Sequence, residues 1–154
     1  MLIKIISVGN KLNQWESKGI EFYTKQLPRN IRIEFINIKS QQNPNYSLNE
    51  IIERESKLIN SKVLEDDYLI AWDSGGEKIS SKDFSNLIFD PQRIKTTISF
   101  IIGGSFGLSE DIIKKTNRVL SASLLTFPHK LFRLILVEQI YRAHTIMHNM
   151  PYHK

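Results

Sequence analysis

The chain has 154 residues and no cysteine, and 21 lysines and arginines against 16 acidic residues give it a formal net charge of +5. This length suits a single domain that buries roughly two-thirds of its unfolded surface without covalent cross-links. The missing cysteines exclude disulfides, thiolate catalysis and cysteine-ligated metal centres, and they fit a reducing compartment. No signal-peptide layout is visible and no apolar run reaches the ~18 residues of a membrane span. We therefore expect a soluble, cytoplasmic protein with no membrane partner.

The positive charge is unevenly distributed along the chain. Residues 1–90 carry 12 basic against 13 acidic side chains, whereas residues 91–154 carry 9 against 3. A polyanion such as nucleic acid is a natural partner for the second segment, because neutralising its phosphates releases counterions. A solubilising surface charge is the alternative.

Sequence patterns in the first half of the chain predict two strands and two helices. Residues 2–8 and 31–38 are β-rich runs, and between them a helix is expected from about residue 13 to residue 27, stopped by Pro28. Polar residues 39–46 predict a surface loop. Ser47 and Glu50 have capping-box spacing, which predicts a second helix that runs to about residue 62.

The second half continues the alternation of strands and helices. Strands are expected at residues 68–72, 98–102 and 119–125. Ser80 or Ser81 caps a short helix after the first of these strands, and Ser109 caps another after the second. The resulting order predicts an α/β fold with a mostly parallel sheet and helices on both faces.

The last predicted helix, residues 131–147, is unusually apolar. Eleven of its 17 residues are apolar and spread over most of its circumference. A helix lying on a sheet needs only a one-sided apolar stripe. A second copy of the chain is the simplest cover for the other side, so we expect a two-fold homodimer.

Two loops follow neighbouring strands and are candidate walls of one site, because ligands of open α/β sheets bind beyond the carboxyl ends of strands. The first holds Gly103, Gly104 and Gly107, and the second is Thr126-Phe127-Pro128-His129. The glycine spacing matches neither a dinucleotide-binding fingerprint nor a P-loop. The remaining functional interpretation is that these glycines let a flat or bulky ligand approach the backbone closely. An ordinary strand-to-helix turn is the alternative. His129 is a candidate catalytic base or phosphate contact. The alternative is that it has only a local structural role at the start of the last helix.

Other polar residues leave two interpretations open. Glu138 and Arg142 are four residues apart on the last helix, which is the spacing of an ion pair on a solvated face. Because their surroundings are apolar, the alternative is that these charges bind a ligand. Asp73 is either a ligand contact or a turn former. The spacing of His144, His148 and His153 does not make a metal site, and we expect no metal.

The motifs SFIIGGSFGL, SASLLTFPHKLFRLILVEQIYRAHTI and terminal PYHK, in this order, resemble the ribosomal RNA large-subunit methyltransferase H family. The resemblance covers the whole chain, from IKIISVGN through WDSGGEK to the last residue. It implies one SPOUT-class domain over residues 1–154 with a C-terminal trefoil knot, a homodimer, and S-adenosylmethionine as the cofactor. It also implies methylation of N3 of a pseudouridine in large-subunit (23S) rRNA. The knot is implied by the resemblance alone. Chains rarely thread through their own loops, so no pattern in the sequence would predict it.

Carried over by position, the resemblance assigns donor binding to three segments. They are Trp72, the pair Gly103 and Gly104, and the run Ser123, Leu124, Leu125, Thr126, Phe127 and Pro128. The family often has a smaller aliphatic residue in place of Trp72, so this contact is expected to differ or to use the backbone alone.

Methyl transfer from a sulfonium is an in-line displacement that requires alignment and no metal. Because the acceptor nitrogen must lose its proton, a base or an oxyanion stabiliser should lie near it. We hypothesise that Arg142 stabilises negative charge on the pyrimidine, and that Tyr152 or His153 positions the base or takes its proton.

The partner implied by the resemblance is large-subunit rRNA. Candidate phosphate contacts are Lys114, Lys115, Arg118, Lys130 and Arg133. Because the domain carries no appended RNA-binding module, we expect recognition of RNA within the assembled ribosome. A catalytically silent, dimeric RNA-binding protein on the same scaffold is the alternative from another functional class.

Overall fold

Five strands form one parallel sheet in the order β2-β1-β4-β3-β5. The computed structural model describes residues 1–94 and 97–153. The strands are β1 (Leu2–Val8), β2 (Arg32–Ile38), β3 (Tyr68–Lys78), β4 (Thr97–Ile102) and β5 (Arg118–Ser121). The helices are α1 (Gln14–Thr24), α2 (Leu48–Asn60), α3 (Ser81–Ile88), α4 (Glu110–Lys115) and α5 (His129–Met147), followed by the 3-10 turn η1 (Pro151–His153). The predicted α/β architecture with a parallel sheet is confirmed.

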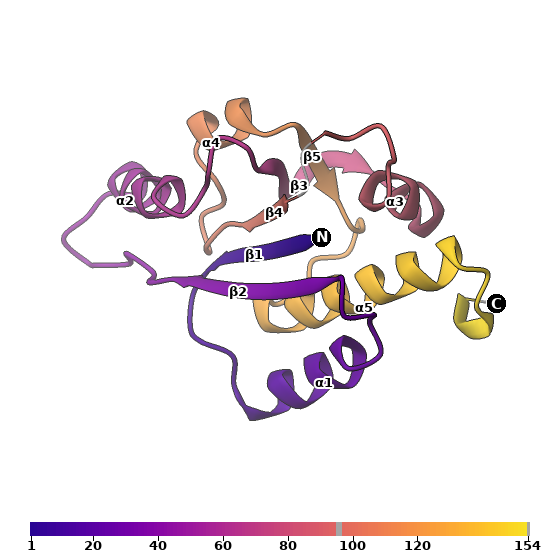
Figure 1. Cartoon of the computed structure of the whole chain (residues 1–154). Helices are drawn as coiled ribbons and strands as arrows, with labels where there is room; N and C mark the ends of the chain where they lie inside the picture. Colours follow the sequence, from indigo (N-terminus) through magenta and orange to yellow (C-terminus); the bar gives the residue numbers. More distant parts are fainter. Residues whose placement is uncertain (95–96, 154) are drawn as a thin grey trace.

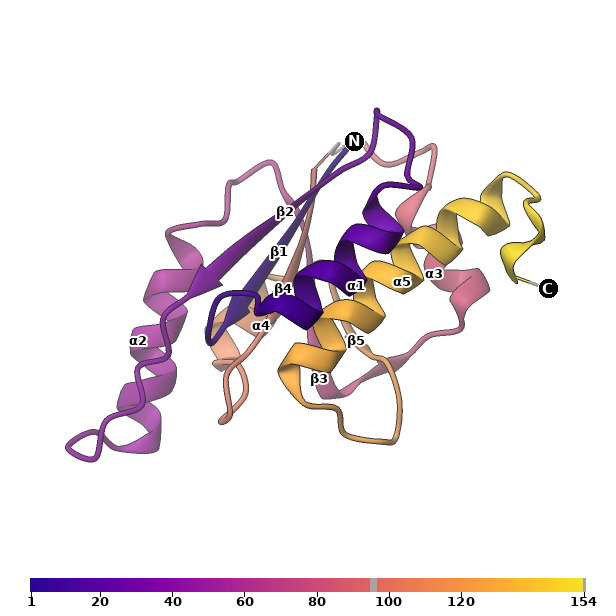
Figure 2. The same cartoon turned by 90° about the horizontal axis from the view of Figure 1, so that it is seen from below.

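Helices cover both faces of the sheet, with α1, α3 and α5 on one face and α2 and α4 on the other (Figures 1 and 2). Side chains alternate between the two cores along each strand, as the pleat requires. Thus Ile3 and Ile5 of β1 face α5, while Ile6 and Val8 face α2 and α4. This burial on both faces explains the nearly continuous apolar runs in the sequence.

Local capping signals in the sequence match the helix starts. Ser47 and Glu50 form the predicted capping box of α2, and Ser80 caps α3. Asn13 and Glu16 form a second capping box at the start of α1. This helix ends at Thr24, which is earlier than the predicted residue 27. The chain therefore leaves the helix before Pro28.

Two strands differ in length from the prediction. The strand β5 ends at Ser121 and does not reach the predicted residue 125. Leu124 and Leu125 lie in the loop that follows it and are 84% and 72% exposed. Apolar side chains alone had suggested that the strand continues to residue 125. In contrast, β3 does not end at Trp72 but resumes after a register shift and pairs with β5 again through Glu77 and Lys78.

The helix α5 lies between two other helices of the same chain. It packs against α1 on one side and α3 on the other (Figure 2). Buried Leu136 and Ile140 belong to the same core as Ile20 of α1 and Phe84 of α3. The apolar circumference of α5 is thus largely explained within one chain and does not by itself require a second copy.

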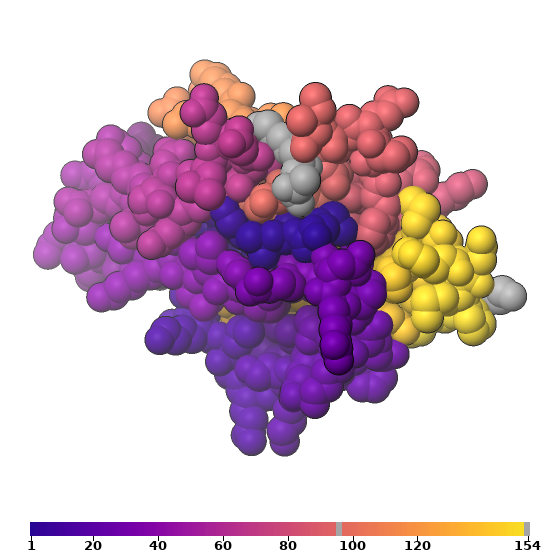
Figure 3. All heavy atoms as spheres, viewed as in Figure 1, coloured from indigo at the N-terminus to yellow at the C-terminus, as the bar shows by residue number. Residues whose placement is uncertain are grey.

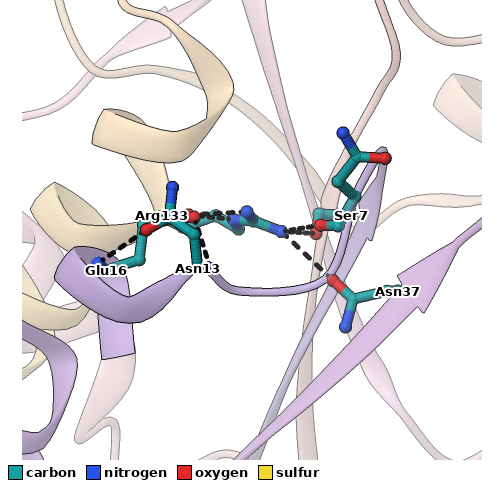
Figure 4. Close-up of polar contacts among 6 residues, drawn as sticks. Ser7, Asn13, Glu16, Asn37 and Arg133 are labelled. Carbon is teal, nitrogen blue, oxygen red and sulfur yellow. Dashed lines mark hydrogen bonds and ion pairs between the residues drawn. The ribbon is translucent and has the colours of Figure 1, made fainter. Parts of the chain in front are cut away.

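A buried ion pair joins α5 to α1 and to the ends of two strands (Figure 4). Arg133 Nε donates to Glu16 Oε1 at 3.0 Å, and Arg133 Nη1 donates to Asn37 Oδ1 at 3.1 Å and to the carbonyl oxygen of Asn10 at 2.9 Å. Arg133 is 2% exposed and Glu16 0%. The prediction that Arg133 contacts RNA phosphates is therefore wrong, because its guanidinium is enclosed by protein acceptors.

The last residues that the structure describes lie at the periphery of the molecule. The C-terminal residues lie on the side opposite α2, where they protrude from the body formed by the sheet and its helices (Figures 1 and 3). Of the helices that the structure describes, none is both long and apolar enough to cross a membrane.

Candidate functional site

A cavity of about 350 Å³ lies at the carboxyl ends of β4 and β5, beside the register shift of β3. Its walls are Trp72, Asp73 and Ser74 of β3, the loops that follow β4 and β5, and the first turn of α5. The residues from these walls include Trp72, Gly103, Gly104, Gly107, Ser123, Leu124, Leu125, Thr126, Phe127, His129 and Phe132. The two loops singled out in the sequence therefore face one cavity, as their positions after neighbouring strands predict.

The glycine turn is shaped by close backbone packing. The amide of Gly107 donates to the carbonyl oxygen of Gly104 at 3.1 Å, and Gly107 has a φ of +83°, which favours glycine. A side chain at Gly103 would place its Cβ 2.8 Å from the backbone of Gly107. Glycine is therefore required here to close the turn beside the cavity.

The opposite wall is the loop of residues 122–128. Within it the Leu125 amide donates to Ser123 Oγ at 2.9 Å, and Pro128 leads directly into α5. Phe127 and, one turn into α5, Phe132 add aromatic surface. Phe132 is not among the site residues predicted from the sequence, because there it is indistinguishable from an ordinary core position of an apolar helix.

Trp72 lies where the cavity meets the core. Its ring contacts Phe132 edge-on with centroids 5.4 Å apart, and it also packs against Phe84 and Phe100. Among the residues that the structure describes, its buried Nε1 finds no hydrogen-bond partner. A buried N–H without an acceptor is costly, and an acceptor on a ligand would satisfy it.

These features fit a compact organic ligand with a flat ring and polar edges. The glycine turn admits close approach, the aromatic side chains offer stacking surface, and one indole N–H needs an acceptor. Asp73 also borders the cavity, but its Oδ1 accepts from the Gly75 amide at 2.9 Å. This local hydrogen bond agrees with a role of Asp73 in shaping the backbone, and the contact of Asp73 with a ligand stays a prediction.

A second polar cluster lies at the other end of α5. Arg142 Nε donates to Glu138 Oε1 at 2.9 Å, and the Tyr152 hydroxyl donates to the same oxygen at 3.0 Å. The hydrogen bond with Glu138 raises the pKa of Arg142. Burial, and then hydrogen bonds with Tyr23 and Glu138, raise the pKa of Tyr152, so its hydroxyl stays protonated at neutral pH.

The structure brings Arg142 and Tyr152 together but does not bring them to the cavity of the same chain. Arg142 lies about 20 Å along the helix axis from His129, which borders the cavity. The side chain of His153 lies outside the part of the chain that the structure describes. The proposed acceptor-side residues are therefore separate from the donor-side loops within one protomer.

The remaining basic candidates lie at the surface. Arg118 Nη2 donates to Glu77 Oε2 at 2.6 Å, Lys114 lies 3.4 Å from Glu110, and Lys115 and Lys130 are exposed. All four remain accessible to a phosphate, since exposed ion pairs are weak and exchange easily.

His144 and His148 lie next to each other at the C-terminal end of α5. His144 is buried, and burial followed by the neighbouring His148 lowers its pKa. The two rings lie with their centroids 4.2 Å apart and their planes tilted by 41°. Within residues 1–94 and 97–153 there is no group of three histidine, aspartate or glutamate side chains arranged to hold a metal ion.

Similarity to known proteins extends over the full chain. A family model described as a predicted SPOUT methyltransferase matches residues 1–153. The chain is 40% identical over 159 residues to ribosomal RNA large subunit methyltransferase H 1 of Clostridium perfringens strain SM101, with all of both chains covered. It is 41% identical, again with both chains covered in full, to ribosomal RNA large subunit methyltransferase H of Clostridium botulinum strain Kyoto.

A solved structure shares the fold at low sequence identity. A probable methylase family protein from Haemophilus influenzae Rd KW20 superimposes with a TM-score of 0.60 over 96% of this chain and 66% of its own, at 9% identity. The family model and the full-length relatives agree with this fold, and the chain belongs to the SPOUT methyltransferase family.

Proposed function

We propose that the protein methylates N3 of a pseudouridine in large-subunit rRNA with S-adenosylmethionine as the donor. The observation that carries the proposal is the cavity between the glycine turn and the loop of residues 122–128. Full-length relatives named ribosomal RNA large subunit methyltransferase H support the substrate class. The resemblance in the sequence supports the pseudouridine and the atom that is methylated.

The donor would be held by the residues that border the cavity. Gly103 and Gly104 give it a close backbone surface, the segment from Ser123 to Phe127 closes over it, and Trp72 offers an indole N–H. Pro128, which follows this segment, does not border the cavity and would act by fixing the backbone of the loop. When bound there, S-adenosylmethionine supplies an electrophilic methyl group on a positively charged sulfur. The protein's own task is to align the acceptor nitrogen with that group and to exclude water.

The acceptor side would be completed by a second subunit. Arg142 and Tyr152 lie far from the cavity of their own chain. We therefore propose a homodimer in which the C-terminal cluster of one chain (Glu138, Arg142 and Tyr152) lies at the cavity of its partner. A C-terminal trefoil knot, which we also propose on the resemblance, would hold the donor loops in a fixed relation to α5.

Within the C-terminal cluster the roles divide by charge. Arg142 is fully cationic, so it is suited to stabilise negative charge on the pyrimidine oxygens as the imino proton leaves. Tyr152 keeps its own proton, so we assign it to positioning and not to proton removal. His153 is the candidate that takes the proton, since histidine titrates near neutral pH.

Titration with the donor tests the donor site. Isothermal titration calorimetry with S-adenosylmethionine should give saturable binding to the wild-type protein, which the catalytically silent RNA-binding alternative gives no reason to expect. A protein that binds rRNA but not the donor would establish that alternative.

Single-turnover methylation tests the acceptor side. Arg142→Ala and a chain truncated after Met150 should each bind the donor normally and methylate slowly. Normal rates in both variants would remove the assignment of Arg142, Tyr152 and His153.

The form of the RNA substrate can be tested by comparing ribosomes with naked rRNA fragments. We expect methylation only of RNA in the assembled particle, because one small domain offers little surface for recognising free RNA.

Neutralising Lys114, Lys115, Arg118 and Lys130 together should weaken ribosome binding and flatten its salt dependence. Equal activity on fragments, or unchanged binding, would contradict these assignments.

A further inference from the structure

Glu55 differs from the other buried charged side chains of the described chain. Lys4 pairs with Asp67 at 2.9 Å, and Arg133 pairs with Glu16. Glu55 is only 3% exposed, yet its partners in the described residues are neutral. They are Ser40 Oγ at 3.4 Å and the Gln41 amide at 3.0 Å, both of which donate to Oε1. A buried carboxylate without a cation is unfavourable unless a positive charge from elsewhere compensates it.

The position of this carboxylate places it directly behind the glycine turn. Glu55 projects from α2, on the face of the sheet opposite α5. Its Oε2 occupies the space beside Gly104, where a Cβ added to that glycine would lie only 2.8 Å away. Gly104 itself borders the donor cavity. One residue without a side chain therefore separates the carboxylate from a ligand in the cavity.

The proposed donor carries the charge that this site lacks. The sulfonium of S-adenosylmethionine is permanently positive, and it becomes a neutral thioether when the methyl group leaves. A buried negative charge next to the cavity interacts with such a cation through a medium of low effective dielectric constant, where attraction is strong over several ångströms. The same charge gives the neutral thioether no such stabilisation.

We propose that Glu55 makes the site prefer the cationic donor over the neutral product, S-adenosylhomocysteine. This inference rests on the proposed function, because it takes the ligand of the cavity to be a sulfonium. Glu55 acts here as a long-range electrostatic residue and needs no contact with the ligand. Its effect is to favour exchange of product for fresh donor after each turnover.

Calorimetric titration of both ligands into Glu55→Gln tests this role. The amide keeps the shape of the side chain and can still accept from Ser40 and Gln41 through its oxygen. We expect the affinity for S-adenosylmethionine to fall about tenfold relative to that for S-adenosylhomocysteine. A purely structural role would weaken both ligands equally, and an unchanged ratio would overturn the inference.

Two substitutions at Ser40 complete the design. Ser40→Ala removes one hydrogen bond to Glu55 but keeps the charge, so the ratio of the two affinities should stay at the wild-type value. Ser40→Lys supplies an ammonium beside the carboxylate and should reproduce the fall in the ratio even if Glu55→Gln does not fold. An unchanged ratio in Ser40→Lys counts against the inference as well.

The outcomes for the wild-type protein separate the two proposals. If it binds neither ligand, the proposed function fails, and the role of Glu55 fails with it. If it binds the donor and both charge variants keep the wild-type ratio, the proposed function stands and only the role of Glu55 is lost.

Discussion

At the scale of single residues, the guanidinium of Arg133 connects three parts of the fold. It joins α5 to the capping box of α1 through Glu16, and it also reaches Asn37 at the end of β2 (Figure 4). The same turn of α5 presents Phe132 to the cavity at the ends of β4 and β5. The ion pair therefore fixes the position of one cavity wall.

Removing one member of this pair should be strongly destabilising. Arg133→Met leaves Glu16 buried without its cation, which we expect to cost about 3–5 kcal/mol of unfolding free energy. Urea denaturation followed by circular dichroism measures this loss. Arg118→Ala, which breaks an exposed ion pair with Glu77, is the control and should cost about 1 kcal/mol or less. Similar losses in the two variants would contradict the role of burial.

His144 should make stability depend on pH. Burial lowers its pKa in the folded state, so the unfolded chain binds a proton more readily. This contribution to stability is complete above the ordinary histidine pKa of about 6.5 and is lost as the pH falls from there through the lowered folded value. Urea unfolding midpoints between pH 7.5 and pH 5 should therefore fall less in His144→Gln than in the wild type. Parallel curves would show that another group dominates.

At the scale of elements, the glycine turn between β4 and α4 is constrained by its own backbone. Gly103→Ala forces a Cβ against Gly107 at 2.8 Å, and backbone atoms cannot move aside as a flexible side chain can. We expect a loss of about 1–3 kcal/mol in stability and a severalfold or greater loss of donor affinity by calorimetry. Gln42→Ala, at an exposed position in the loop between β2 and α2 that does not border the cavity, should change neither quantity. Wild-type affinity in Gly103→Ala would exclude this turn from the donor site.

The sequence predicts elements better than it predicts their ends. The capping residues Ser47 and Ser109 mark their helices correctly, because a cap is a local interaction. The end of β5 was wrong because Leu124 and Leu125 look like strand residues, yet they lie exposed on a loop beside the cavity. The continuation of β3 past its glycines depends on pairing with a distant strand. The burial of Arg133 and the position of Glu55 behind Gly104 likewise depend on contacts far apart in sequence.

The two ends of α5 carry different halves of the proposed site, and this separation can be tested with mixed dimers. Arg142→Ala and Gly103→Ala subunits should each be impaired as homodimers, the first in the rate of methylation and the second in donor binding. Random pairing makes about half of all dimers mixed, each with one complete site, so the mixture should regain about a quarter of wild-type activity. Methylation measured after mixing, unfolding and refolding the two variants checks this value. An inactive mixture would mean that each chain completes its own site.

At the scale of the whole molecule, the proposed dimer requires an apolar surface outside the core. Trp15 and Phe22 of α1, seven residues apart, are exposed on one side of that helix, and Leu131 of α5 is also exposed. We expect Phe22→Glu to weaken self-association, as measured by analytical ultracentrifugation. Leu64→Glu is a matched control, because Leu64 has the same exposed fraction of 63% in the loop between α2 and β3. A larger effect of Leu64→Glu would place the interface elsewhere.

The two edges of the sheet limit how copies of this chain can meet. The edge strand β2 alternates charged Arg32 and Glu34, 3.5 Å apart, with its inward-facing side chains. The other edge strand, β5, has only four residues. Charged or very short edge strands discourage the addition of a further strand from a neighbouring molecule. The chain is thereby protected against growth into extended β-aggregates, and self-association is directed to its helical surfaces.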